Sequence, residues 1–272
     1  MKTILVTGAN GMFGQDLVPL LKEKGYFVIE TDIHNMDITK QVNAFFKENP
    51  CDVVIHGAAY TNVDGAESDP DTAFLINGTG SENLARITGE LEIPIVYIST
   101  DYVFDGTKNT PYIPDDKTNP QSIYGKSKLA GELAVQKYNQ KHYITRTSWL
   151  YGHKGKNFVE TIIKLGKEKP ELKVVDDQWG CPTWTVDLAK AVIKILEEHP
   201  YGIYHTCGSG ETTWYGFTKK IFEVKNIKTP IYPVTTAEFP RPAKRPAYSV
   251  MDNAGLCQHW ERAIEEYSEV LV

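Results

Sequence analysis

The stretch KTILVTGANGMFG, residues 2–14, decides the fold class of the chain. Its first half is apolar and rich in β-branched side chains, which predicts a short buried strand. Three glycines then follow at three-residue intervals, namely Gly8, Gly11 and Gly14. Glycines allow a tight turn and let the backbone approach a pyrophosphate, and a helix that begins there offers free N–H groups. The stretch therefore predicts a strand that leads through a phosphate-binding turn into a helix.

The residues that follow extend this pattern into a dinucleotide-binding unit. Residues 15–24 predict an amphipathic helix, and residues 26–31 predict a second strand that is closed by Asp32. An acid at this point is placed to bond the ribose of an adenosine, and it favours NAD because it would repel a 2′-phosphate. Asp37 and Ile38, at an expected helix start, are candidate adenine contacts, although Asp37 also suits a plain helix N-cap.

Strands and helices continue to alternate as far as residue 147. Strands are expected over residues 52–56, 93–99 and 143–147, and a long helix over residues 70–91. Such alternation predicts a parallel sheet that is covered by helices on both faces. We therefore expect an α/β fold with a Rossmann-type doubly wound parallel sheet.

The second half of the chain is less regular and predicts a smaller lobe. Helices are expected over residues 157–168, 186–198 and 214–224, and strands over residues 172–175 and 202–206. We expect residues 1–150 to form the dinucleotide-binding domain, with sheet-completing segments within about 176–210. Residues 151–272 should form mainly a smaller C-terminal α/β lobe that binds the substrate.

Composition narrows the classes of partner. The chain has 29 basic and 35 acidic residues, for a net charge of -6, which argues against a basic nucleic-acid-binding surface. Its four cysteines are far apart and show neither metal-ligand spacing nor a disulfide framework. The chain opens on a strand pattern without a signal peptide, and no apolar run reaches the length of a membrane span. We expect a cytoplasmic protein with no membrane partner and no metal.

A tyrosine and a lysine lie four residues apart in YGKSK, residues 124–128. The segment after them reads as helix, and residues i and i+4 share one face of a helix. A nearby cation favours the phenolate, so Lys128 is expected to lower the pKa of Tyr124 and to let the phenol exchange a proton near neutral pH. The same spacing also occurs by chance at ordinary helix starts, so the neighbouring motifs decide its meaning.

Those motifs point to carbonyl reduction. Small residues at 57–61 and the hydroxyls of Ser99 and Thr100 follow expected strands, where ligands bind in open α/β sheets. Hydride would pass from a nicotinamide to a carbonyl carbon, and Tyr124 would protonate the oxygen. Thr100 would hydrogen-bond that oxygen, unless it merely caps a turn, and Lys128 would bond the nicotinamide ribose.

Several motifs together resemble a known family, the dTDP-4-dehydrorhamnose reductases among the extended short-chain dehydrogenase/reductases. The motifs are GANGMFG, HGAAYTNVDGAE, STDYVFDG, YGKSKLAGE, RTSWLYG and RPAKRP. The resemblance covers nearly the whole chain. It implies NADPH- or NADH-dependent reduction of the C4 ketone of dTDP-4-dehydro-L-rhamnose to dTDP-L-rhamnose, the last step of dTDP-rhamnose biosynthesis.

The resemblance also implies site residues. Thr100, Tyr124 and Lys128 would form the catalytic set. The expected cofactor-binding residues are Gly8, Asn10, Gly11, Met12, Phe13, Gly14, Asp32, Asp37, Ile38, Ala58, Ala59, Tyr60, Asn77, Ser99, Tyr124 and Lys128. The expected substrate-binding residues are Val63, Asp64, Thr100, Asp101, Tyr102, Trp149, Arg241 and Arg245.

Some substrate contacts also have physical arguments of their own. The dehydratases of the superfamily carry Thr-Asp-Glu where this chain has Thr-Asp-Tyr, and Tyr102 cannot supply the carboxylate that elimination of water needs. Tyr102 and Trp149 offer flat apolar surfaces to a deoxysugar, although Trp149 also suits core packing. Arg241 and Arg245 can bond a diphosphate through two donors each, the alternative being a solvated basic tail.

Oligomeric state and two other functions remain open. Some relatives join two subunits through magnesium held by glutamates, one of them just after the glycine turn, where this chain has Gln15. An amide is a poorer ligand than a carboxylate for this hard cation, so we expect a monomer or a homodimer without a metal bridge. The alternatives are a nucleotide-sugar epimerase with the same Tyr/Lys pair, and a non-catalytic regulatory subunit resembling the β subunit of methionine adenosyltransferase.

Overall fold

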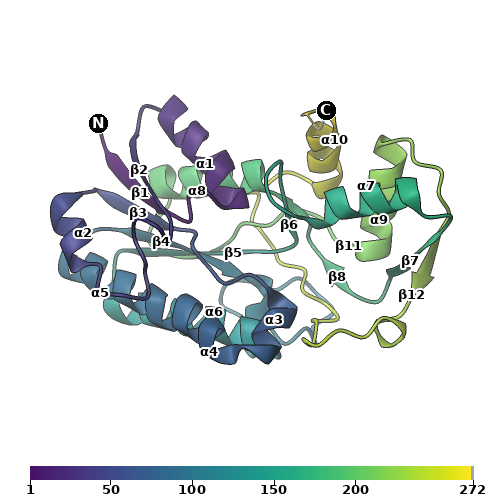
Figure 1. Ribbon diagram of the computed structural model, residues 1–272, viewed down its shortest axis with the longest axis horizontal. Coiled ribbons are helices and arrows are strands. Elements are labelled where there is room, and N and C mark those ends of the chain that lie inside the picture. Colours follow the sequence, from purple (N-terminus) through teal and green to yellow (C-terminus); the bar gives the residue numbers. More distant parts are fainter. Residues whose placement is uncertain (271–272) are drawn as a thin grey trace.

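The computed structural model describes residues 1–270 as a larger lobe that carries the N-terminus and a smaller lobe beside it (Figure 1). The larger lobe contains a six-stranded sheet in the order β10-β5-β4-β3-β1-β2, and every pair in it is parallel. Its strands are β1 (Thr3–Thr7), β2 (Phe27–Thr31), β3 (Val53–His56), β4 (Ile95–Thr100), β5 (His142–Thr147) and β10 (Gly202–His205). The expected α/β class with a parallel Rossmann-type sheet is confirmed.

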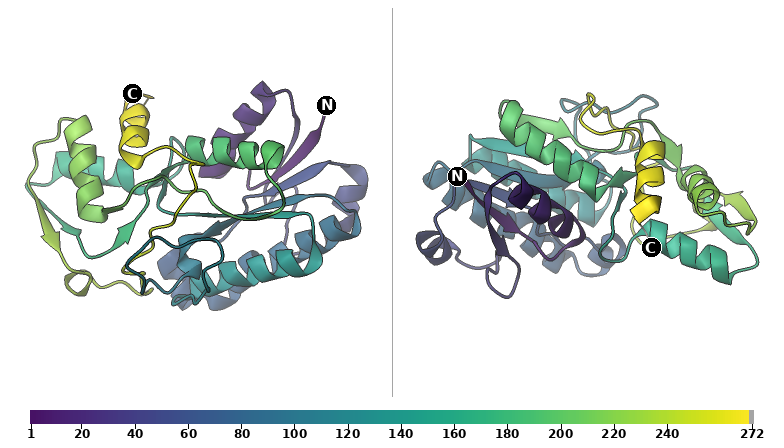
Figure 2. Two further views of the ribbon diagram at one scale, coloured as in Figure 1. Left: turned by 180° about the vertical axis from the view of Figure 1, so that it is seen from behind. Right: turned by 90° about the horizontal axis from the view of Figure 1, so that it is seen from above.

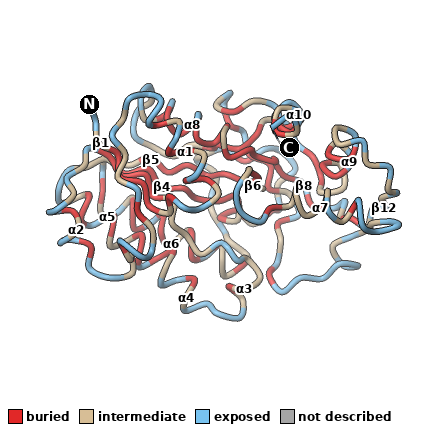
Figure 3. The backbone as a smooth tube through the Cα atoms, turned by 45° about the horizontal axis from the view of Figure 1, so that its top comes forward, coloured by how far each residue is buried: buried red, intermediate tan, exposed pale blue. Residues whose placement is uncertain are grey.

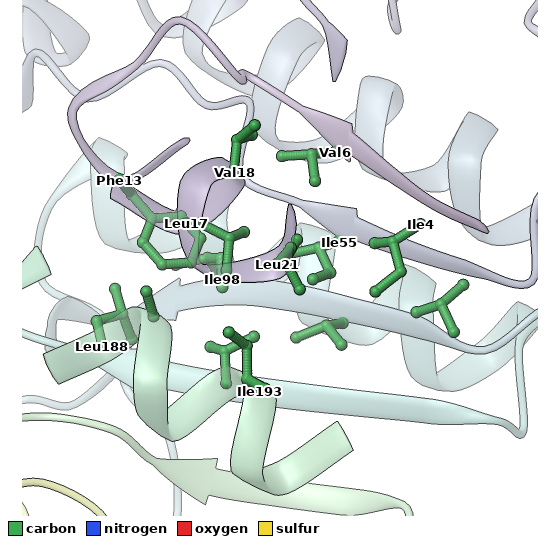
Figure 4. Close-up of a cluster of buried hydrophobic side chains, with 14 of the residues drawn as sticks. Ile4, Val6, Phe13, Leu17, Val18, Leu21, Ile55, Ile98, Leu188 and Ile193 are labelled. Carbon is green, nitrogen blue, oxygen red and sulfur yellow. The ribbon is translucent and has the colours of Figure 1, made fainter. Parts of the chain in front are cut away.

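Helices cover both faces of this sheet, because successive side chains of a strand point to opposite faces. Ile4 and Val6 of β1 pack beneath α1 (Met12–Glu23) and α8 (Thr185–Glu198), as Figure 4 shows. Leu5 joins the core on the other face, which is covered by α2 (Asn43–Glu48), α5 (Ser81–Glu90) and α6 (Ile123–Tyr138). The four inner strands β5, β4, β3 and β1 are consequently buried along most of their length, whereas the edge strands β2 and β10 are only partly buried (Figure 3).

The long helix expected over residues 70–91 is helical but not uniform. After α3 (Val63–Ser68), α4 (Pro70–Phe74) is joined to α5 by a π-helical turn over Leu75–Gly80. Such turns are rare and are frequent near functional sites. This one holds the buried Asn77, whose Nδ2 donates to Ser127 Oγ at 2.9 Å. The turn thereby ties this region to α6, the helix that carries Tyr124 and Lys128.

The smaller lobe has a separate core, built around Tyr151, Phe217, Trp260 and Tyr267. Figure 2 shows its helices beside the end of the main sheet. Its elements are β6 (Leu150–Tyr151), α7 (Phe158–Glu168), β7 (Leu172–Val175), β8 (Trp179–Gly180), β9 (Thr183–Trp184), β11 (Thr212–Thr213), α9 (Trp214–Val224), β12 (Ile231–Val234) and α10 (Trp260–Val270). Short 3-10 turns span Asp101–Val103 and Thr236–Glu238.

The chain returns to the main sheet after entering the smaller lobe. β10 pairs with β5, and α8 packs on α1. We therefore propose that the dinucleotide-binding domain comprises residues 1–150 with sheet-completing segments within about 176–210, and that 151–272 form mainly the substrate lobe. Within residues 1–270, no helix combines the length and apolar character needed to cross a bilayer.

Candidate active site

A cleft of about 620 Å³ opens at the carboxyl ends of the central strands and reaches the smaller lobe. It brings together most of the residues proposed from the sequence: Gly8, Gly11, Met12, Phe13, Gly14, Asp32, Ala58, Ala59, Val63, Ser99, Thr100, Asp101, Tyr102, Tyr124, Lys128 and Trp149. Other proposed residues lie outside its lining: Asn10, Asp37, Ile38, Tyr60, Asp64, Asn77, Arg241 and Arg245. The residues proposed for the cofactor and those proposed for the substrate therefore share one cleft, and eight of the proposed residues lie outside its lining.

The glycine turn forms a cradle whose backbone packs too closely to admit a side chain at two of its glycines. Gly8 has a φ of 69°, and a Cβ there would lie 2.8 Å from the backbone nitrogen of Ala58. Gly14 lies in the first turn of α1, where a Cβ would lie 2.5 Å from the carbonyl oxygens of Gly8 and Ala9. The N-terminus of α1 thus faces the cleft with its backbone accessible, which fits the pyrophosphate of a dinucleotide.

We expect Gly14→Ala to disrupt this cradle. The added methyl group cannot fit between two carbonyl oxygens, so the turn must shift, at a cost of about 1–3 kcal/mol in folding stability. Affinity for a reduced nicotinamide dinucleotide should fall by about tenfold or more, since 1.4 kcal/mol of lost binding is tenfold. Thermal unfolding and fluorescence titration measure the two effects.

Gly78→Ala provides the matched control for this substitution. Its Cβ would meet only the side chain of Ala130 at 3.5 Å and that of Phe74 at 3.9 Å, which are ordinary contacts. Unchanged cofactor affinity in Gly14→Ala would contradict the assignment of the turn to the pyrophosphate.

The residues proposed for adenosine divide into two groups. Asp32 lines the cleft, and its carboxylate accepts hydrogen bonds from Asn10 Nδ2 and, at 2.8 Å, from the backbone nitrogen of His34. Asp37 instead accepts two bonds from Thr39, and these lower its pKa. Ile38 is buried in the core. Asp32 therefore lies in the lining of the cleft, whereas Asp37 and Ile38 lie outside it.

The proposed catalytic residues come from two elements that pack directly together. Thr100 ends β4, and its Oγ1 donates to Asp101 Oδ1 at 3.0 Å and accepts from the Tyr102 nitrogen at 3.3 Å. Tyr124 lies in the first turn of α6, which Ser122 caps. The rings of Tyr102 and Tyr124 meet edge to face, with centroids 5.5 Å apart. The start of α6 thus holds the phenol beside the end of β4.

The pKa of Tyr124 differs from what the sequence predicted. Burial raises the pKa of Tyr124 to about 12, with the charge of Asp101 acting in the same direction and the Thr100 hydroxyl against it. We expected Lys128 to lower the pKa of Tyr124, but within the described part of the chain Lys128 is not among the groups found to shift it. Its Nζ donates to the Ile98 carbonyl at 2.7 Å and lies 4.2 Å from the centre of the Tyr97 ring. The ammonium is thus held by a backbone carbonyl of β4.

Two other groups titrate unusually. Burial lowers the pKa of Lys128 to about 7, although the charge of Glu132 opposes this. Burial also raises the pKa of Asp101 to about 6, with the hydroxyls of Ser249 and Thr100 acting against it. Shifted groups that share a cleft are typical of sites that transfer protons.

The wall on the side of the smaller lobe is a pair of stacked tryptophans. Trp149 has a φ of 48°, and its ring stacks on Trp214 with centroids 3.5 Å apart and planes 6° apart. Gln178 Oε1 accepts from Trp214 Nε1 at 3.2 Å and fixes the outer ring. Trp149 is partly exposed in the cleft and does not belong to a core. Trp214 and Lys156 also line the cleft, and the sequence analysis proposed neither.

The two arginines of the RPAKRP segment lie differently from each other. Arg245 is partly buried, and its Nη1 and Nη2 donate to the two carboxylate oxygens of Asp64. Burial alone would raise the pKa of Asp64, but these bonds lower it overall. Arg241 lies over the ring of Phe239, 4.7 Å from its centre. The structure thus excludes a solvated tail for Arg245 and places Asp64 and Arg245 in one ion pair.

Comparison with known proteins gives consistent results. Residues 1–272 match the family model described as RmlD substrate binding domain. The spore coat polysaccharide biosynthesis protein SpsK of Bacillus subtilis is 45% identical, over 98% of this chain and 97% of its own. The crystal structure of a dTDP-4-dehydrorhamnose reductase from Clostridium acetobutylicum matches with a TM-score of 0.97 and 47% identity, covering 99% of each chain. That of the Bacillus anthracis dTDP-4-dehydrorhamnose reductase in complex with NADP matches with a TM-score of 0.94 and 40% identity, covering 98% of each.

Proposed function

The chain belongs to the RmlD substrate-binding-domain family of dTDP-4-dehydrorhamnose reductases, and we propose that it reduces the C4 ketone of dTDP-4-dehydro-L-rhamnose to dTDP-L-rhamnose with NADPH or NADH. One observation carries this proposal. Thr100, Tyr124 and Lys128 line the same cleft as the glycine cradle. A phenol, a hydroxyl and an ammonium therefore lie where a nicotinamide would meet a carbonyl group.

A bound NADPH or NADH would supply the hydride, and the residues of this chain would supply the binding site and the proton. Gly11, Met12 and Phe13 would form the cradle for the pyrophosphate, and Asp32 would accept hydrogen bonds from the hydroxyls of the adenosine ribose. Lys128 binds the ribose on the nicotinamide side. The glycine turn supports this assignment, since it lines the cleft and its close backbone packing leaves no room for a Cβ at Gly8 or Gly14.

Tyr124 donates the proton to the C4 oxygen as negative charge develops on it. The pKa of about 12 keeps the phenol protonated at neutral pH, which is the form that a donor needs. The Thr100 hydroxyl lies beside the phenol and holds the oxygen in line. The protonated state of Tyr124 and the position of Thr100 beside it support these two proposed roles.

The wall of the cleft favours reduction over dehydration. Tyr102 stands at the position where elimination of water would need a carboxylate. Together with Trp149, which stacks on Trp214, it presents an aromatic surface to the cleft. Such surfaces pack well against a deoxysugar, which has an apolar methyl edge. The Asp64–Arg245 pair adjoins this wall through α3, and we propose that Arg245 and Arg241 meet the diphosphate of the dTDP group.

The direct test is the loss of absorbance of NADPH or NADH when freshly made dTDP-4-dehydro-L-rhamnose is added. We expect oxidation of the cofactor in proportion to the sugar that is consumed. An absence of oxidation with both cofactors refutes the proposed function. Cofactor that co-purifies with the protein and interconverts sugars without net oxidation would instead indicate an epimerase.

We expect Asp32→Ala to weaken NADH binding more than NADPH binding. The carboxylate bonds the ribose hydroxyls of NADH but repels the 2′-phosphate of NADPH, so its loss removes an attraction in one case and a repulsion in the other. The dissociation constant of NADH should rise by about tenfold, the effect of one hydrogen bond to a charged group. Fluorescence titration with both cofactors measures it.

The control for Asp32→Ala is Glu30→Ala, which removes an acid from β2, the strand that Asp32 directly follows. Glu30 is paired with Lys22 at the surface, with Oε1 2.6 Å from Nζ. It should leave both affinities unchanged. Equal effects of Asp32→Ala on the two cofactors would show that Asp32 does not contact the ribose.

We further propose a cytoplasmic monomer or homodimer without a metal bridge. The Gln15 amide donates to the Asn10 carbonyl at 2.6 Å, so this side chain is occupied within the glycine turn. The mass measured by light scattering should be the same in magnesium and in chelator. A mass that halves on chelation contradicts this proposal.

A further inference from the structure

Helix α6 presents a third polar residue on the face that carries Tyr124 and Lys128. Glu132 follows Lys128 by four residues, so the three side chains succeed one another at one-turn intervals. Its carboxylate is fully buried, with a relative exposure of 0%. Carboxylates are almost never buried in this way unless they are paired, and the pairing of Glu132 reveals its role.

Glu132 joins α6 to the two strands beneath the catalytic residues. Arg146 of β5 donates to it through both Nε, at 3.0 Å, and Nη2, at 2.8 Å. Ser99 of β4 donates to Glu132 Oε1 at 2.5 Å. Ser99 pairs with Arg146 in the sheet and directly precedes Thr100. A shift of α6 along β4 would therefore break three charge-assisted hydrogen bonds.

Glu132 is also the charge that supports a protonated Lys128. Within residues 1–270, the ionisable groups found to contact Lys128 or to interact with its charge are Glu132 on α6, Tyr97 on β4 and His56 on β3, and Tyr124 lies one turn before it on α6. Burial lowers the pKa of His56 to about 3 and raises that of Tyr97, so both are neutral near pH 7. Within the described part of the chain, Glu132 is thus the one carboxylate found to raise the pKa of Lys128.

We propose that Glu132 is a positioning residue for the reduction, which keeps Lys128 charged in its buried site and holds α6 so that Tyr124 stays beside Thr100. This inference rests on the proposed function. Stability alone does not require such a pair, because apolar residues of similar volume can replace a buried ion pair without loss. The arrangement instead places one negative charge one turn behind a lysine that must remain positive.

The expected signature is a displaced pH profile. A lysine is charged below its pKa, so activity that needs this charge disappears as the pH rises through the pKa. In Glu132→Gln the opposing charge is lost and the pKa of Lys128 falls further. The alkaline limb of kcat/KM should therefore move to lower pH by roughly one unit or more, as for other close buried charges.

Three further variants separate charge from folding. Glu132→Gln with Arg146→Met removes both charges and leaves no unpaired ion. Its alkaline limb should also move, since the charge of Glu132 raises the pKa of Lys128 and no such effect of Arg146 is found. Glu132→Asp keeps the charge but shortens the side chain, so the limb stays and turnover falls. Glu82→Gln makes the same change in an exposed pair on α5 and should alter neither.

The pKa of Lys128 can also be followed without catalysis, by NMR titration of lysines labelled at the ε carbon and assigned with Lys128→Arg. We expect a lower value in both Glu132→Gln variants. The inference is overturned if the double variant keeps the wild-type values of both the alkaline limb of kcat/KM and the pKa of Lys128. Wild-type protein that fails to oxidise the cofactor refutes the proposed function instead, and the NMR result then still decides the role of Glu132.

Discussion

Tyr124→Phe should lower turnover by about 10²–10⁴-fold, the usual contribution of a positioned acid, while the protein still binds its cofactor. The substitution removes one oxygen atom from the first turn of α6 and leaves the ring against Tyr102. The reaction then has no group to protonate the C4 oxygen, whereas the cradle at Gly8 to Gly14 is untouched. Steady-state kinetics and cofactor titration of the same preparation measure the two quantities.

The control is Tyr138→Phe, the same change at the other end of α6. The Tyr138 hydroxyl bonds Arg86 on α5, far from the cleft. Its turnover should match that of the wild type. Near-normal turnover in Tyr124→Phe would show that another group donates the proton, and the assigned role of Tyr124 would then be wrong.

Lys128→Met should reduce kcat/KM by about 10²-fold or more, because an ammonium in a water-poor site stabilises charge strongly. Methionine keeps an unbranched apolar side chain of nearly the same length but removes the ammonium that lies over the Tyr97 ring. It removes the charge and the donor for the nicotinamide ribose, so cofactor affinity should fall as well. This combined loss distinguishes Lys128 from Tyr124, whose substitution spares binding.

Lys126→Met serves as the control, since Lys126 lies in the same turn of α6 but is exposed. It should change neither kinetics nor binding. If Lys128→Met retains wild-type cofactor affinity and activity, the lysine contacts neither the ribose nor the reacting atoms.

The main sheet and the glycine cradle could be predicted because their signals are local. β1 and the turn after it are read directly from an apolar run followed by three spaced glycines, and both lie where they were expected. Local patterns also predicted α7, α8 and α9 within one or two residues. The prediction missed α10, although its buried Trp260, Ala263, Ile264 and Tyr267 recur at helical spacing.

Parts of the site depend on contacts that no local pattern contains. Trp214 lines the cleft stacked against Trp149, a residue far earlier in the chain. Asp64 and Arg245 meet across 181 positions. The pKa of Lys128 depends on burial and on Glu132, so spacing alone could place the lysine but could not give its charge. The residue types of the site were therefore readable, whereas their electrostatics required the fold.

The central claim is that this cleft reduces a 4-keto sugar nucleotide, and the most direct measurement combines product and cofactor. Wild-type protein, dTDP-4-dehydro-L-rhamnose and NADPH or NADH should yield dTDP-L-rhamnose, with one cofactor oxidised for each sugar reduced and with no product from Tyr124→Phe at matched times. Formation of no dTDP-L-rhamnose with either cofactor, or equal formation by the Tyr124→Phe protein, would contradict the account.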